Sequence, residues 1–181
     1  MVRGRLSLRS AAWLVGLAAV VGCAGILMSR GLEAATEGTK APEFVSATWL
    51  NSPSLRIAKL RGHVVLVEFW TFGCYNCRHV EPYVKAWHQR YASEGLVVIG
   101  VHTPESDYER DHERLEQYVR DRQLAYPVVL DDDFAMWTRY GNGAWPSLYL
   151  IDKRGVIQYA HVGEGRYGQT EQRIQELLAE P

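Results

Sequence analysis

Hydrophobic residues along the chain alternate between short continuous runs and stretches with a helical period. Residues 63–70 and 96–101 are almost entirely apolar, which is typical of strands buried on both faces of a sheet. Between them, from Cys74 to about Ala92, apolar residues recur every three or four positions and predict a helix. Its inner face would hold Val80, Tyr83, Val84, Trp87 and Tyr91. A strand, a helix and a second strand are therefore expected in succession.

The rest of the body continues this alternation. The further elements expected are a short strand pair at 44–50 and 55–60, a solvated helix at 107–123, a strand at 126–130, a helix capped by an aspartate at 133–140, a hairpin at 147–160 and a closing helix at 170–178. Strands and helices in this order predict an α/β domain with a central mixed sheet flanked by helices on both faces.

The N-terminal segment has a different pattern. Arg3, Arg5 and Arg9 precede an apolar run from Ala11 to Met28, which is 18 residues without a charge. A helix that spans a bilayer needs about 18–20 such residues, so this run is just long enough. The basic flank would stay on the cytoplasmic side and place the following domain outside. We therefore expect residues 1–30 to be a signal anchor, 31–40 a linker and 41–181 the folded domain.

A second interpretation of this segment depends on Cys23. The sequence Val20-Val-Gly-Cys23 resembles the lipobox of bacterial lipoproteins, in which the cysteine is lipidated and becomes the new N-terminus. The apolar residues from Ala24 to Met28 favour the uncleaved anchor, and cleavage as an ordinary signal is a third alternative. All three export the domain, so we expect it in the bacterial cell envelope, on the outer side of the cytoplasmic membrane.

The charge of the chain limits the kinds of molecule that it can be expected to bind. It carries 20 basic and 21 acidic residues, and four of the basic ones are arginines within residues 1–30. The remaining 151 residues therefore hold 16 basic and 21 acidic side chains, a balance of −5. A mildly acidic body offers no clustered basic surface to phosphates, which excludes nucleic acid as a partner.

The candidate chemistry lies in the motif Cys74-Tyr-Asn-Cys77, where a buried strand ends and a helix begins. The free amide groups and the dipole at a helix N-terminus favour the thiolate form of the first cysteine. A thiolate is the attacking species in disulfide exchange, and the second thiol resolves the mixed disulfide. We therefore expect Cys74 to be the nucleophile and Cys77 the less exposed resolving thiol, with no cofactor beyond their own redox-active disulfide.

Three other uses of the cysteine pair fit the sequence less well. A structural disulfide across so short a loop gains little chain entropy. A zinc site needs two more ligands, and although His63 and His79 are near in sequence, no second cysteine pair exists. Covalent haem attachment requires a histidine directly after Cys77, where Arg78 stands. No metal is therefore expected.

The run from Val64 to Cys77 resembles the active-site strand and helix of the thioredoxin superfamily. The segments 98–105, 145–152 and 163–165 make the chain similar, more narrowly, to exported TlpA-like thiol–disulfide oxidoreductases and to the C-terminal domain of DipZ-type proteins. The resemblance covers residues 41–181. It implies a thioredoxin-like fold with a TlpA-type helix–strand insertion near 107–130.

Several site residues follow from this resemblance. Pro82 matches the proline that kinks the active-site helix, and Trp145-Pro146 matches a cis-proline loop that faces the disulfide and binds the substrate backbone. Trp70 and Tyr75 flank the cysteines and are expected at the substrate surface as well. Because Tyr75 and Asn76 replace the usual Gly-Pro, the redox direction does not carry over from thioredoxin.

Glu68 matches the buried acid that in thioredoxins moves a proton to or from the resolving cysteine. A carboxyl group within an apolar strand should have a raised pKa, which suits this role. The alternative is a solvated glutamate at the end of the strand.

The function expected is an envelope disulfide reductase that takes electrons from a membrane thiol carrier and passes them to exported proteins, with apocytochrome c among the candidate clients. One alternative is a thiol peroxidase, because Thr71 lies three residues before Cys74 as in peroxiredoxins, although Phe69-Trp70 replace the expected proline. Another is a module that binds an apoprotein or copper without catalysis. Copper delivery proteins on this fold separate their cysteines by three residues, whereas two separate them here.

Overall fold

The computed structural model describes residues 35–181. The expected anchor, Cys23 and the first part of the expected linker lie outside the described residues. Within 35–181, no helix combines the length and the apolar character needed to cross a membrane. Residues 35–40, the last part of that linker, contact the domain: Ala35 is buried, Gly38 donates a backbone hydrogen bond to Ile157, and Lys40 bridges to Val156.

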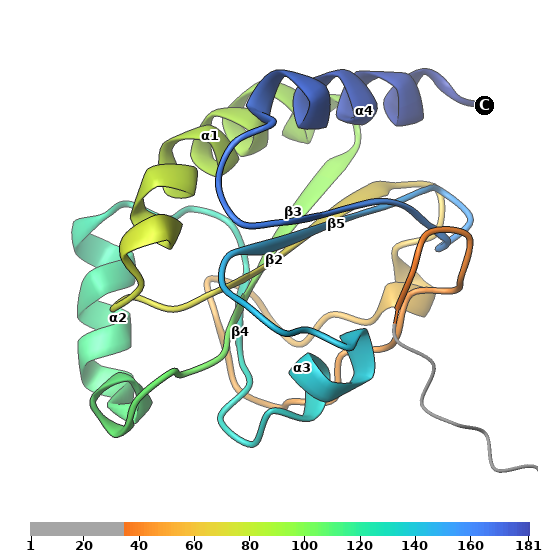
Figure 1. The fold of residues 1–181 in the computed structure, drawn as a ribbon. Helices are drawn as coiled ribbons and strands as arrows, with labels where there is room; N and C mark the ends of the chain where they lie inside the picture. The colour runs from red at the N-terminus through yellow and green to blue at the C-terminus, as the bar shows by residue number, and fades with distance from the viewer. Residues whose placement is uncertain (1–34) are drawn as a thin grey trace, which may run out of the picture. The chain divides into compact units, whose positions relative to one another are not determined.

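One six-stranded mixed sheet forms the centre of the domain (Figure 1). Its strands are β1 (Trp49–Leu50), β2 (Val64–Trp70), β3 (Leu96–His102), β4 (Val128–Leu130), β5 (Ser147–Ile151) and β6 (Ile157–Val162). They lie in the order β1-β4-β3-β2-β5-β6. Strands β2, β3 and β4 are parallel, whereas β1, β5 and β6 each pair antiparallel with a neighbour. The α/β class and the mixed sheet are confirmed.

Helices cover both faces of this sheet (Figure 1). They are α1 (Tyr75–Tyr91), α2 (His112–Asp121), α3 (Ala135–Tyr140) and α4 (Tyr167–Ala179). Alternate residues of β2 point to opposite faces, as the pleat requires. Leu66 packs with buried residues of α1, α2 and α4, whereas Val67 packs with Met136 and Tyr140 of α3. The expected helix–strand insertion is present as α2 and β4.

The prediction of an N-terminal strand pair is wrong. Only β1 is a strand, and it pairs with β4, while the segment 55–60 contains a short 3-10 helix at Ile57–Lys59 that buries Ile57. Asn51 explains the difference, because its backbone is in the left-handed region at φ 64° and turns the chain directly after β1. Its side-chain amide donates hydrogen bonds to two carbonyls of the segment leading into β4, which fixes that turn.

Three helices differ in detail from the sequence prediction. The helix expected at 107–123 is divided into a 3-10 helix, Asp107–Arg110, and α2, because Asp111 is extended and caps α2 through the N–H of Arg114. α4 begins at Tyr167, three residues earlier than expected. Tyr83 of α1, expected on the inner face, is 42% exposed and stacks on Tyr167, with ring centroids 3.6 Å apart.

The cap of α3 also differs from the simple expectation. Phe134 occupies the N-cap position with φ 59°, and two aspartates before it accept the free N–H groups. Asp133 accepts from Ala135 at 3.1 Å, and the buried Asp131 accepts from the next two residues at 2.8 Å each. The helix is therefore capped by aspartates, as predicted, but from outside the N-cap position.

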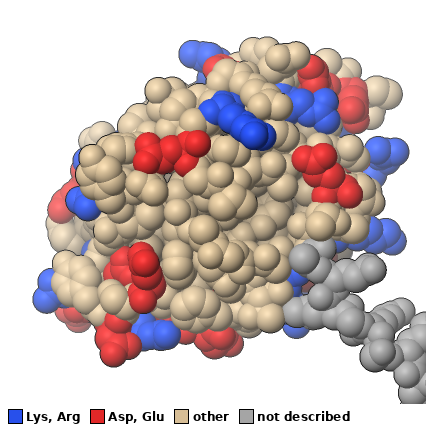
Figure 2. All heavy atoms as spheres, in the orientation of Figure 1, with Lys and Arg blue, Asp and Glu red and all other residues tan. Residues whose placement is uncertain are grey.

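The surface of the domain is mixed in charge. Figure 2 shows acidic and basic side chains interspersed on the face seen in Figure 1, with uncharged residues between them. Most ion pairs of the described residues are exposed, such as Arg120 with Glu116 on α2, and pairs of this kind contribute little to stability.

Candidate active site

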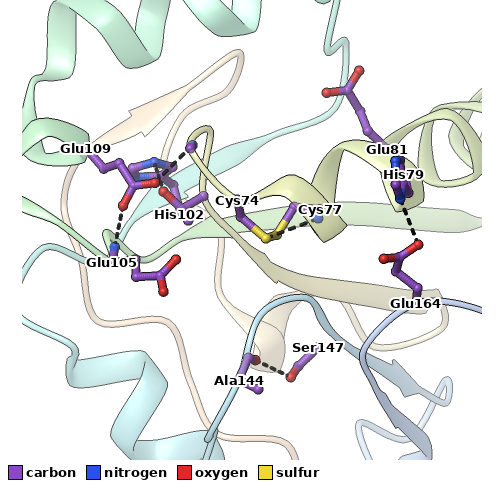
Figure 3. Close-up of a disulfide and its surroundings, with 12 residues drawn as sticks. Cys74, Cys77, His79, Glu81, His102, Glu105, Glu109, Ala144, Ser147 and Glu164 are labelled. Carbon is purple, nitrogen blue, oxygen red and sulfur yellow. Dashed lines mark hydrogen bonds and ion pairs between the residues drawn. A yellow bond between two sulfur atoms is a disulfide. The ribbon is translucent and has the colours of Figure 1, made fainter.

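Cys74 and Cys77 form a disulfide at the start of α1, with their Cα atoms 5.3 Å apart (Figure 3). Cys74 is the N-cap residue of the helix, and its sulfur accepts the backbone N–H of Cys77 at 3.1 Å. Cys74 is 8% exposed and Cys77 is 3% exposed. The order of exposure expected for an attacking and a resolving thiol is therefore present, and the first sulfur lies where the helix offers its free N–H groups.

The chain reaches this position because β2 ends just before it. After Trp70 the residues Thr71 to Gly73 form a turn, closed by a hydrogen bond of 3.2 Å from the N–H of Cys74 to the carbonyl of Thr71. β2 lies in the middle of the sheet, between β3 and β5. The disulfide thus lies at the carboxyl end of a central strand, the edge at which open α/β sheets bind their ligands.

The peptide bond between Trp145 and Pro146 is cis, as the resemblance to thioredoxins implies. Ser147 pairs with Phe69 across the sheet, so the loop before β5 and the turn after β2 lie at the same end of neighbouring strands. Figure 3 shows the segment from Ala144 to Ser147 in the surroundings of the disulfide. The Ser147 hydroxyl donates to the carbonyl of Ala144 at 2.7 Å and fixes the loop.

Glu68 lies within the sheet rather than at its edge in water, since it is 2% exposed. It points to the same face as Leu66 and Trp70, the face on which α1 and Cys77 pack. The pKa of Glu68 is raised from 4.5 to about 8, mainly by burial and in part by the negative charge of Glu81, while a hydrogen bond with Tyr126 acts in the opposite direction. The solvated alternative is excluded, and burial favours the protonated form of the carboxyl group.

Glu81 is a buried carboxylate that the sequence analysis missed. It lies on α1, four residues after Cys77, and is 6% exposed. Its oxygens accept a hydrogen bond from the Tyr118 hydroxyl at 2.7 Å and one from Arg122 Nε at 2.9 Å. The signal in the sequence was an acidic residue directly after Val80, on the helix face that packs against the sheet.

Glu109 is a second buried carboxylate that the sequence analysis missed, at 3% exposed. It accepts a hydrogen bond of 2.9 Å from the N–H of Gly73, the residue before Cys74 (Figure 3). It also accepts from the N–H groups of Glu105 and Ser106, at 2.6 Å and 2.8 Å. The pattern Ser106-x-x-Glu109 is that of a capping box and could have indicated a structured side chain here.

The remaining residues expected at the site are divided between surface and interior. Tyr75 is 67% exposed, and its ring lies 4.5 Å from that of His79. Trp70 is only 4% exposed and packs edge-on against the buried His102, so it does not belong to the exposed substrate surface that was expected. Pro82 lies inside α1, which continues for nine residues beyond it.

The chain is similar to a known protein family and to several known proteins. Residues 38–160 match the model of the AhpC/TSA family. DipZ of Mycobacterium tuberculosis is 41% identical over 142 residues, covering 76% of this chain and 20% of DipZ. The thiol–disulfide oxidoreductase ResA of Bacillus thuringiensis is 28% identical over 161 residues, covering 87% of each chain.

A solved structure described as a thioredoxin-like superfamily protein has a TM-score of 0.74 and 27% identity, covering 79% of this chain and 98% of its own. The chain spans about a fifth of the length of the DipZ proteins that it matches. The match to the family model extends over most of the described residues, and the disulfide, the helix N-terminus and the cis-proline loop all lie within it. The chain therefore belongs to the AhpC/TSA family, as a thioredoxin-like thiol–disulfide oxidoreductase domain related to DipZ and ResA.

Proposed function

We propose that this protein reduces disulfides of exported proteins, with Cys74 as the attacking thiol and Cys77 as the resolving thiol. The observation that carries the proposal is the Cys74–Cys77 disulfide at the N-terminus of α1, next to the loop of Pro146. A thiolate at Cys74 would face the free N–H groups and positive dipole of a 17-residue helix.

The reaction balances with Glu68 as the proton shuttle. A donor thiolate attacks Cys74, the disulfide breaks, and Cys77 leaves as a thiolate that takes the proton of Glu68. A second donor thiolate then releases Cys74, and the donor is left as a disulfide. In the forward step, the Cys74 thiolate attacks a client disulfide, Cys77 returns its proton to Glu68, and its thiolate closes the disulfide and frees the reduced client.

The client chain is proposed to bind between Tyr75 and the loop of Trp145 and Pro146. Tyr75 offers an exposed ring beside the disulfide. Val162, at the end of β6, is 57% exposed and pairs with Ser147, directly after the loop. An apolar side chain of the client on either side of its cysteine would therefore find an apolar contact.

The location and the electron donor that we propose for this protein are based on its N-terminal sequence. We propose that residues 1–30 anchor the chain in the cytoplasmic membrane, as a signal anchor or through lipidated Cys23. Residues 31–40 would be the linker, with 35–40 lying against the domain, and 41–181 the domain outside. An anchored domain would meet a membrane thiol carrier as its donor, and exported proteins such as apocytochrome c as clients. The similarity to ResA and DipZ supports this setting.

The cysteine assignment is tested with variants made in a Cys23→Ser background, which removes the third thiol. Cys74→Ser should abolish the reduction of a protein disulfide by a dithiol donor, whereas Cys77→Ser should accumulate a mixed disulfide between Cys74 and the client. The Cys23→Ser protein is the control and should retain full exchange activity in solution. Activity that survives both substitutions contradicts the assignment.

The direction is tested by equilibrium with a thiol redox buffer, followed by tryptophan fluorescence. A midpoint potential near about −270 mV supports a reductant, whereas a value near about −120 mV indicates an oxidant that introduces disulfides. Hydrogen peroxide is assayed in parallel, because a peroxidase would consume it at the same rate as or faster than it reduces protein disulfides. The buried Thr71 hydroxyl lies 3.2 Å from Nε2 of His102, inside the core, which favours disulfide exchange over that alternative.

A further inference from the structure

Glu109 is a buried acidic residue next to the dithiol. It has no role in the reaction proposed above. Three backbone N–H groups donate to its carboxyl oxygens, those of Gly73, Glu105 and Ser106, at distances of 2.6 to 2.9 Å. A carboxylate can only accept hydrogen bonds, and all three of these bonds are donated to it. Glu109 therefore places a carboxylate in the protein interior, beside the active-site turn.

The contact between Glu109 and the active-site turn is close. Glu109 comes from the 3-10 helix Asp107–Arg110, which is 36 residues from Gly73 in sequence. A Cβ atom at Gly73 would lie 2.1 Å from Oε1 of Glu109, so the carboxylate fills the space that a side chain would take. In Figure 3 the carboxylate lies on one side of Cys74, with its hydrogen bond directed at the turn.

We propose that Glu109 is a positioning residue that fixes the turn before Cys74 and, through its charge, makes the dithiol more reducing. The proposal deepens the proposed function and rests on Cys74 being the attacking thiol. Two negative charges that are close together in a protein interior repel each other much more strongly than in water. The Cys74 thiolate is then less stable, the reduced form is disfavoured, and the pair gives up electrons more readily.

Two cations lie near the turn in sequence, Arg78 on α1 and Arg110 directly after Glu109, and both are exposed, so solvent and salt screen their charges. Burial lowers the pKa of His102 to about 3, so this ring is neutral. His79 pairs with Glu164 at 2.9 Å, and because both side chains are more than a third exposed, solvent and salt screen their charges. The carboxylate of Glu105 is exposed and screened in the same way. The N-terminus of α1 is the positive partner of Cys74, which occupies the N-cap position of that helix.

The variant that tests the proposal is Glu109→Gln, made in the full-length protein with Cys23→Ser. Glutamine keeps an oxygen that can accept from Gly73 but has no charge. In the thiol redox buffer, the equilibrium constant for reducing the Cys74–Cys77 disulfide should increase about tenfold, which is a rise of about 30 mV in midpoint potential. Alkylation of Cys74 by iodoacetamide should also begin at lower pH, because its thiolate becomes more stable.

Glu105→Gln is the matched control, since it removes an exposed charge from the same loop and should leave both readings unchanged. If Glu109→Gln lowers thermal stability while potential and alkylation profile stay as in the parent, the residue is only structural and the proposal is overturned. A fall in potential overturns it as well. Neither reading involves a client protein, so failure here is distinct from the loss of exchange activity that would refute the proposed function.

If the glutamine variant does not fold, the proposal can still be tested on protein that retains Glu109. Coupling between two sites is reciprocal, so ionisation of Cys74 must act on Glu109 as well. In the reduced protein, the carboxyl carbon-13 resonance of Glu109 should shift as Cys74 titrates, and the shift should be absent in Cys74→Ser. A resonance that does not respond to Cys74 overturns the proposal.

Discussion

Replacement of Glu68 by glutamine should make the oxidised protein more stable at neutral and alkaline pH. Burial, helped by the charge of Glu81, raises the pKa of Glu68 from 4.5 to about 8. Between these two pH values the folded protein still holds a proton that the unfolded chain has lost. The free energy of unfolding of the parent protein therefore decreases as the pH rises through this interval.

The magnitude follows from the width of the interval. Each pH unit within this interval lowers the free energy of unfolding by about 1.36 kcal/mol. With a folded-state pKa of about 8, this loss is on the order of 3 kcal/mol at pH 7 and 5 kcal/mol above pH 8. Below pH 4.5 both states hold the proton and the cost vanishes. Glutamine has nearly the same shape and stays neutral at every pH, so Glu68→Gln lacks the cost altogether.

Urea unfolding of the two oxidised proteins between about pH 4 and pH 9 measures this difference. The advantage of Glu68→Gln in unfolding free energy should grow by several kcal/mol over this range, while the contributions of titrating groups that are not coupled to Glu68 cancel in the comparison. Glu94→Gln removes an exposed carboxyl group and is the control, which should follow the parent at every pH. Parallel curves for the parent and Glu68→Gln would refute the reasoning.

Two further predictions concern the neighbours of this acid and of the active-site turn. Glu81→Gln removes a charge that raises the pKa of Glu68, so Glu68 should titrate at lower pH when followed by carboxyl carbon-13 resonances; an unchanged titration would contradict the coupling. Gly73→Ala would place Cβ 2.1 Å from the carboxylate of Glu109 and should lower the unfolding free energy by about 1–3 kcal/mol in urea. Gly143→Ala, with nothing within 4 Å of its Cβ, should change it little, and equal effects of the two alanines would show that the close contact is absent.

The order of strands and helices in the core could be predicted from the sequence because burial has a local signature. β2 and β3 are buried on both faces, so each is a continuous apolar run, and α1 between them repeats its apolar residues at helical spacing. The hairpin of β5 and β6 was visible for a similar reason, with a polar turn between two apolar segments. In each case the pattern within one segment was sufficient.

The prediction failed where distant contacts decide the local structure. The segment 44–60 is apolar enough for two strands, but Asn51 turns the chain because its side chain bonds carbonyls more than 70 residues away. The helix expected at 107–123 is interrupted at Asp111, where the backbone is extended and the side chain starts a new helix. Hydropathy contains neither the turn conformation nor the hydrogen-bond partner.

The sequence by itself determined the position of the reactive pair, since a Cys-x-x-Cys motif between a buried strand and a helix is a property of 14 consecutive residues, 64–77. It is also the sole basis for the interpretation of residues 1–30 as an export segment. Only the tertiary structure decided the electrostatic surroundings of that pair. Glu81 and Glu109 look like ordinary acidic residues in the sequence, and their burial depends on Arg122 and Gly73, which are 41 and 36 positions away. The strength of a charge in a protein depends on what packs around it, and packing is set by the whole fold.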